Sequence, residues 1–266
     1  MRNLMIAVFT ACCIGLLSLR TIIKIRYIDL DIGFYSVSNA AVTSFNILLF
    51  VGMVLMLVLG YRGVYSDFLI CKTKGIAACA LFAGAGGMLF IHCIGNIAAE
   101  RRETGALLAA SNALDLIGVL SGVCLVAMAV RFFLLYKTIP LTAALIPVAY
   151  TLSTLIYRFF SYNTVNSISD HMLEILFYAM CTLLLLQQVR VLCGIGPGRG
   201  LKMICALGFM TALSGLTLAF PQLAARSGGT VAVVDLPVIE LIFILLISLY
   251  ALCFAIHTLS LRSMTA

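Results

Sequence analysis

Charged residues are scarce in this chain: Lys, Arg, Asp and Glu make up 10% of its 266 residues, whereas 63% are hydrophobic. Soluble globular domains have about 25% charged residues, so this composition excludes that class. The sequence therefore predicts an all-α, polytopic membrane helix bundle with about eight transmembrane helices and short loops. Eight apolar runs are close to the length of about 20 residues that a helix needs to cross a bilayer. They lie at 4–20, 39–60, 75–97, 114–133, 139–157, 171–192, 201–221 and 237–258.

Long polar connections between these runs are also missing. The longest, from 21 to 38, is too short to form a soluble domain with its own hydrophobic core. The runs do not alternate polar and apolar residues as the strands of a membrane barrel do, and Leu183 to Leu186, for example, are apolar on every helix face. We therefore expect one integral membrane domain that covers residues 1–266.

Acidic residues are few, and they are distributed unevenly along the chain. If the eight runs alternate in direction, Asp67 is alone on the side of both termini, and ten of the 17 Lys and Arg residues share that side. Because cytoplasmic loops carry an excess of Lys and Arg, we predict that both termini are cytoplasmic. The remaining nine of the ten carboxylates are then on the outer side: Asp29, Asp31, Glu100, Glu103, Asp115, Asp170, Glu174, Asp235 and Glu240.

The net charge of +7 does not indicate nucleic-acid binding, because no run of basic residues occurs. Cytoplasmic Lys and Arg side chains interact with anionic lipid headgroups, so membrane lipids are the expected partners. On the outer side, the segment Arg20 to Arg26 is predicted to extend the first helix beyond the bilayer, with its cationic side chains along the interface.

Cysteine and glycine give further expectations about packing. The ten cysteines lie in the apolar runs or near their cytoplasmic ends, where disulfides are not expected, so we predict reduced, space-filling thiols. Small residues allow helices to approach closely; the five glycines of run 75–97 predict a central helix, and Gly118 and Gly122 are expected to face it. The glycine-rich stretch 194–200 lacks the context of a dinucleotide-binding loop and is predicted to be a turn.

Polar side chains inside the apolar runs mark a candidate site, because ionisable groups are costly in a membrane and usually face protein or water. On the third helix, His92, Asn96 and Glu100 recur at every fourth position, which puts them on one helix face that rises to the outer surface. The other members lie near the outer ends of their helices, so together they predict a polar vestibule open to the outside. The candidate residues are His92, Asn96, Glu100, Asp115, Arg158, His171, Glu174 and Glu240.

Three interpretations of this vestibule compete. His171 and Glu174 share a helix face, but di-metal bundles use the order Glu-x-x-His twice, so we predict no metal and no cofactor. In a transporter, Glu174, Glu240 and Arg158 would bind an ion or proton, although no inverted repeat is visible. In the third interpretation, Arg158 pairs with Glu174 across a short hairpin and the group is structural.

Catalytic motifs are missing as well. A nucleophile needs an adjacent base and a third group that orients the base, and no Ser or Cys here has such a context, so we predict no enzyme and no catalytic residue. Two functions remain. The first is a membrane scaffold or regulatory partner, which would contact other membrane proteins. The alternative is a carrier of a small solute or an ion, and one form of this alternative is a carrier whose transport is coupled to protons.

Two stretches resemble an uncharacterised family of bacterial multi-pass membrane proteins. One runs from Arg26 to Tyr35 after the first helix, and the other is Tyr157 to Phe160, with Ile168 opening a further helix that ends at Arg190. Proteins of that family have an Asp and a Thr-Gly-Phe-Phe-like turn before the second helix, where this chain has Ile32 and Tyr35. The resemblance implies a multi-pass protein of the bacterial inner membrane, that is, the cell membrane, and no established activity.

Overall fold

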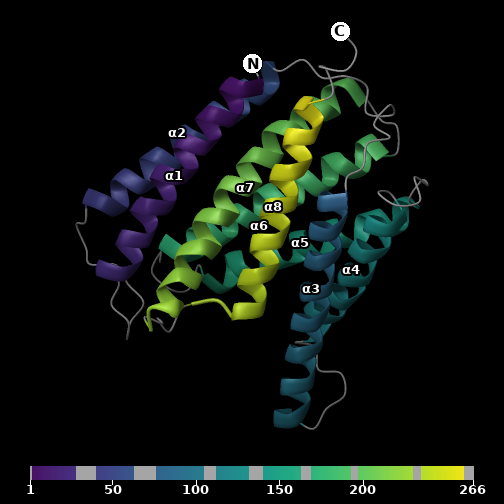
Figure 1. Cartoon of the computed structure of the whole chain (residues 1–266). Helices are drawn as coiled ribbons and strands as arrows, with labels where there is room; N and C mark the ends of the chain where they lie inside the picture. The colour runs from purple at the N-terminus through teal and green to yellow at the C-terminus, as the bar shows by residue number, and fades with distance from the viewer. Residues whose placement is uncertain are drawn as a thin grey trace.

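Eight helices make up the computed structural model, which describes residues 2–27, 40–62, 76–104, 112–131, 140–162, 169–192, 197–229 and 235–260. Each helix coincides with one predicted run, and no strand occurs in the described ranges. The helices are α1 (Arg2–Arg26), α2 (Ala40–Arg62), α3 (Ile76–Thr104), α4 (Ala113–Ala129), α5 (Leu141–Tyr162), α6 (Ser169–Leu192), α7 (Pro197–Ser227) and α8 (Val238–Ser260) (Figure 1).

Seven of these helices are long and apolar enough to cross a membrane. The exception is α4, which is apolar but has 17 residues, and at about 1.5 Å per residue it is shorter than a hydrocarbon core of about 30 Å. The all-α, multi-pass prediction is therefore confirmed. Whether α4 makes an eighth crossing, and which side each end faces, stay predictions.

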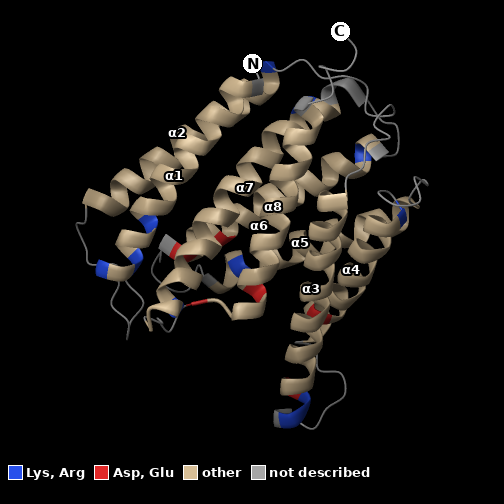
Figure 2. Cartoon of the chain, viewed as in Figure 1, with Lys and Arg blue, Asp and Glu red and all other residues tan. Residues whose placement is uncertain are grey.

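The bundle has two chemically different ends. The first residues of α1 and the last of α8 lie at the same end, whereas the Asp and Glu residues, coloured red, lie in the opposite half (Figure 2). We call that half the acidic end; its carboxylates are Glu100, Asp115, Asp170, Glu174, Asp235 and Glu240. These six share one half of the bundle, as predicted, and the side of the membrane that this half faces stays a prediction. The side chains of Asp29, Asp31, Asp67 and Glu103 lie outside the described part, as does the segment from Asp29 to Tyr35.

The central helix is α7, so the prediction that the third helix is central was wrong. In the apolar stretch of α7, 89% of the residues are buried, against 39% in α3, and α7 packs against α1, α2, α6 and α8. Not every glycine of α3 marks a close contact between helices. A Cβ atom on Gly208 would lie 2.9 Å from Cβ of Ala255, whereas Gly87 and Gly95 of α3 have no such neighbour within 4 Å.

The contact between α3 and α4 depends on two glycines, as the sequence predicted. A Cβ atom added to Gly122 would lie 2.7 Å from the carbonyl oxygen of Gly86, and one added to Gly86 would lie 2.8 Å from that of Gly122. Gly118, one turn earlier in α4, faces Cys93 of α3 and Tyr150 of α5. This close packing brings the first turn of α4 next to both α3 and α5.

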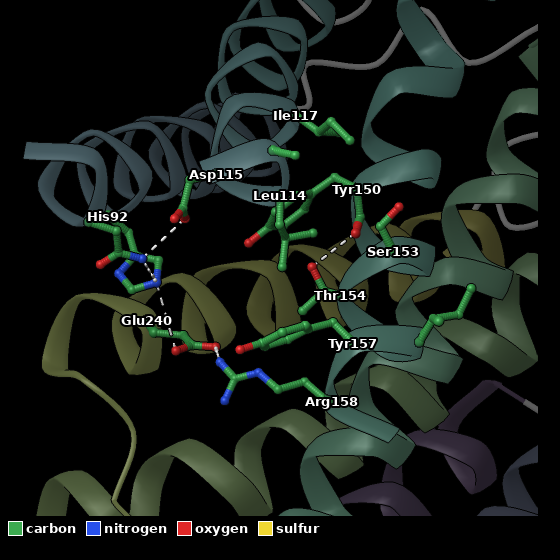
Figure 3. Close-up of a pocket in the computed structure, with 13 residues that line it drawn as sticks. His92, Leu114, Asp115, Ile117, Tyr150, Ser153, Thr154, Tyr157, Arg158 and Glu240 are labelled. Atoms are coloured by element: carbon green, nitrogen blue, oxygen red, sulfur yellow. Dashed lines mark hydrogen bonds and ion pairs between the residues drawn. The ribbon is translucent and has the colours of Figure 1, made fainter. Parts of the chain in front are cut away.

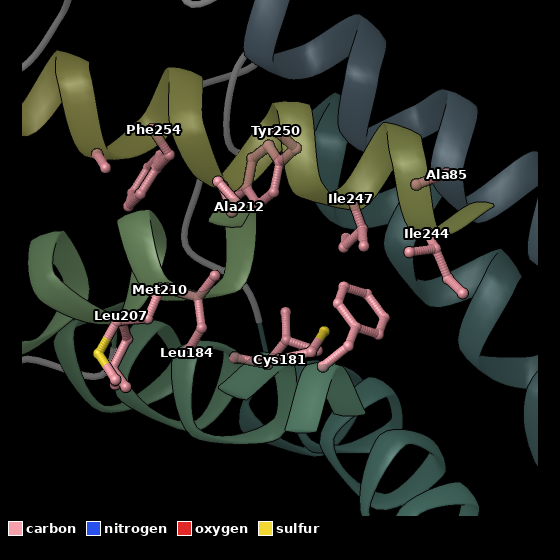
Figure 4. Close-up of a cluster of buried hydrophobic side chains, with 14 of the residues drawn as sticks. Ala85, Cys181, Leu184, Leu207, Met210, Ala212, Ile244, Ile247, Tyr250 and Phe254 are labelled. Carbon is pink, nitrogen blue, oxygen red and sulfur yellow. The ribbon is translucent and has the colours of Figure 1, made fainter. Parts of the chain in front are cut away.

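The apolar core is formed mainly by α6, α7 and α8 (Figure 4). Its side chains include Leu184, Met210, Ile247 and Phe254. All eight cysteines in the described part are free, and five of them are buried, which confirms the expectation of unpaired, space-filling thiols for these positions. Cys71 and Cys193 lie outside the described part.

The predicted turn at 194–200 needs a correction. The helix α7 begins at Pro197, so the second half of this stretch is the first helical turn, and residues 194–196 lie outside the described ranges. Proline is well suited to the first position of a helix, because its fixed φ matches the helix and its missing N–H would have no partner there.

We expect Gly122→Ala to destabilise the protein by about 1–3 kcal/mol, because the new methyl group would displace the α3 backbone. The matched control is Gly87→Ala, which meets no atom within 4 Å and should be neutral or stabilising by up to about 1 kcal/mol, since Ala favours helix over Gly. Thermal unfolding of both variants in detergent measures the difference. Equal melting temperatures would show that the α3–α4 contact is not close.

Candidate functional site

A pocket of about 650 Å³ opens between α3, α4, α5 and α8 at the acidic end. Charged, amide, hydroxyl and aromatic side chains from all four helices face it (Figure 3). Five of the eight predicted candidates are among its lining residues, which are His92, Asn96, Ala113, Leu114, Asp115, Ile117, Tyr150, Ser153, Thr154, Ile156, Tyr157, Arg158 and Glu240.

Glu240 of α8 joins three other helices at one wall of the pocket. Its Oε1 accepts hydrogen bonds from Arg158 Nη2 of α5 at 2.8 Å and from the Tyr178 hydroxyl of α6 at 3.0 Å. Its Oε2 lies 3.8 Å from Nε2 of His92 on α3. Glu240 is 3% exposed and lies in the first turn of α8, where the helix dipole favours a negative charge.

Arg158 bridges two carboxylates. Besides Glu240, it approaches Glu174, with 3.0 Å between Nη1 and Oε1, so the predicted Arg158–Glu174 pair is confirmed. Glu174 is 1% exposed and does not line the pocket, but it lies directly behind the arginine. Because a guanidinium group presents its N–H donors in a fixed fork, one side chain fixes the relative positions of α5, α6 and α8.

Asp115, in the first turn of α4, is the other carboxylate that lines the pocket. Its Oδ1 accepts a hydrogen bond from Asn96 Nδ2 at 3.1 Å, and the same nitrogen lies 3.4 Å from Nε2 of His92. Among the described residues, no Lys or Arg forms an ion pair with Asp115. The carboxylate is half-buried, so it can be reached from the pocket.

A second ion cluster lies away from the pocket and joins α1 to α6 and to the residues before α8. Lys24 Nζ is 2.7 Å from Asp170 Oδ2; Arg20 also pairs with Asp170, and Lys24 with Asp235. Arg20 and Lys24 are each 1% exposed. The prediction that these cations lie along the membrane interface was therefore wrong: spaced by one helical turn, they share the buried face of α1.

Besides Glu174, two predicted candidates do not line the pocket. Glu100 lies one turn beyond Asn96, where α3 extends past the neighbouring helices (Figure 1), and His171 is half-buried on α6 near Asp170. Sequence reasoning did not place Tyr150 or Tyr157 at the site, because both are aromatic residues within an apolar run. In the described residues, no three His, Cys, Asp or Glu side chains are placed to hold a metal ion.

Comparisons with protein-family models, with curated proteins and with solved structures found no match to this chain. The resemblance to bacterial multi-pass membrane proteins therefore stays a prediction, and the interpretation of the site depends on its geometry.

We expect Asp170→Asn to destabilise the protein by about 3–5 kcal/mol, because it leaves a buried excess of positive charge beside Arg20 and Lys24. Lys24→Gln introduced into the same chain should recover part of the loss by restoring the balance of charge. The control is Arg26→Gln on the exposed side of α1, which should change the melting temperature little. If Asp170→Asn melted like the parent, the cluster would not be buried.

Proposed function

We propose that this multi-pass membrane protein binds a small polar or charged solute in the pocket at the acidic end and acts as a small-solute or ion carrier. The observation that supports this most is the pocket itself. Its volume of about 650 Å³ is in the range of ligand sites, roughly 300–1,000 Å³. Four helices contribute polar groups to it, although such groups are costly inside a membrane bundle.

The exposure of the charged groups also favours binding over a purely structural role. The Arg158 side chain is 21% exposed and the His92 side chain 13%, so both present polar atoms to the cavity. A network that only held helices together would be most stable if it were fully enclosed and satisfied. Here one side of the network is open to an incoming molecule.

A carrier also needs a helix that changes shape, and α5 has a feature suited to this. Pro147 lies inside α5 and removes one backbone hydrogen bond, which weakens or bends a helix at that point. One turn later, the Thr151 hydroxyl donates to the Pro147 carbonyl oxygen at 3.1 Å, and such bonds from Thr side chains often bend a helix further. Tyr150, Thr154 and Arg158 follow on the same helix, so bending of α5 would move this wall of the pocket.

The sidedness of the proposal follows from the charge distribution. With both termini in the cytoplasm, as the Lys and Arg distribution favours, the acidic end faces the outside of the cell membrane. A solute would then enter the pocket from the outside, close to Asp115 and Glu240.

One observation favours the second function, a non-enzymatic membrane scaffold or regulatory partner. Arg158, Glu174 and Glu240 already pair with one another, so these three charges need no ligand for their stability. In that case the partners would be other membrane proteins, and the pocket would have no occupant. Neither proposal assigns a catalytic residue.

Thermal unfolding of the purified protein with a panel of solutes separates the two functions. The panel includes organic cations, organic anions, neutral polar solutes and inorganic ions. A ligand that binds only the native state stabilises it by mass action, by about 2.7 kcal/mol at 100 times Kd. We expect at least one class to raise the melting temperature of the parent chain, and not that of Ala113→Trp, in which a large ring would narrow the pocket.

The control for this experiment is Ala77→Trp, an exposed position at the other end of α3, which should retain the ligand effect. If no solute class changed the melting temperature of the parent chain, the carrier proposal would fail and the scaffold proposal would gain support.

A further inference from the structure

The charges around the pocket do not balance. Counting the pocket residues and Glu174 behind them, the three carboxylates Asp115, Glu174 and Glu240 surround one permanent cation, Arg158. Among these four side chains, the carboxylates exceed the permanent cation by two in a partly enclosed site. Fields in such a site are stronger than in water, so it attracts cations and repels anions.

The two carboxylates that line the pocket differ in how much of their charge is already compensated. Glu240 is held by Arg158 and by the Tyr178 hydroxyl. Asp115 accepts a hydrogen bond from the neutral amide of Asn96, and no described Lys or Arg forms an ion pair with it. Asp115 is therefore the group with the most to gain from a positively charged ligand.

The other side chains that line the pocket indicate the chemical character of the rest of the ligand. The pocket is far larger than a bare metal ion, and no three described metal-ligating side chains converge there. Around the acidic groups lie apolar and aromatic side chains, namely Leu114, Ile117, Tyr150, Ile156 and Tyr157. In Figure 3, Asp115, His92 and Glu240 line one side, while Leu114 and Tyr157 face them. Tyrosine rings can also attract a cation directly.

We propose that the ligand is a small organic amine in its protonated form, with an ammonium group bound at Asp115 and an apolar body against the aromatic and aliphatic wall. This inference rests on the proposed function and narrows it to a class of solute. Charge-assisted hydrogen bonds from the ammonium group to Asp115 would supply the selectivity.

Asp115 has one other explanation. A carboxylate in the first turn of a helix is favourable without any ligand, because it interacts with the helix dipole and the free N–H groups. That explanation predicts no preference among ligands of different charge, so the two explanations can be separated by binding.

Three probes of similar shape and different charge test the inference on the full-length protein in detergent: phenethylamine, phenethyl alcohol and phenylacetate. Dissociation constants are measured by calorimetry, beside the melting temperatures. We expect phenethylamine to bind at least about tenfold more tightly than the alcohol, with no binding of phenylacetate. Asp115→Asn should weaken amine binding by about tenfold or more, whereas Glu100→Gln, outside the pocket, should leave it unchanged.

If Asp115→Asn fails to fold, the comparison of the three probes on the parent chain still tests the inference. If the alcohol or phenylacetate bound as tightly as phenethylamine or more tightly, the assignment of an amine ligand would be overturned, but the carrier proposal would stand. The same conclusion would follow if none of the three probes bound and another class of solute stabilised the protein. Amine binding that is unchanged in a folded Asp115→Asn variant would also overturn it. Failure of every solute in the wider panel would instead overturn the proposed function itself.

Discussion

Pairing of buried charges is the constraint on which this bundle depends. An isolated charge inside a membrane protein is costly, so Arg20 and Lys24 are stable only where Asp170 and Asp235 meet them, and Arg158 only beside Glu174 and Glu240. Asp170 and Glu174 are one turn apart on α6. This helix therefore sets the position of α1 on one side and of α5 and α8 on the other.

Close backbone packing supplies the second constraint. Gly86 and Gly122 allow α4 to approach α3, and this contact brings Asp115 within hydrogen-bonding distance of Asn96. The pocket is the space left where the polar faces of α3, α4, α5 and α8 meet without filling it. Its acidic character follows, because α4 and α8 each begin with a carboxylate in the first turn.

Much of the fold could be predicted from apolar length alone, since each predicted run became a helix. The Arg158–Glu174 pair was also predictable, because a short hairpin keeps the ends of neighbouring helices together. The partners of Arg20 and Lys24 were not, because Asp170 is 150 and 146 residues away. Glu100 shows a different limit of prediction from sequence. Periodicity places Glu100 on the same helix face as His92 and Asn96, but it does not show that the neighbouring helices end before they reach Glu100.

The most direct test of the account is whether water reaches the pocket from outside the cell. Leu114→Cys places a thiol on the pocket wall, and a membrane-impermeant maleimide added to intact expressing cells reports its accessibility over the background of the parent chain. We predict labelling of Leu114→Cys, and none of Leu120→Cys, which is exposed on α4 outside the pocket lining. Labelling of Leu114→Cys only after the membrane is permeabilised, or not at all, would contradict a pocket open to the outside.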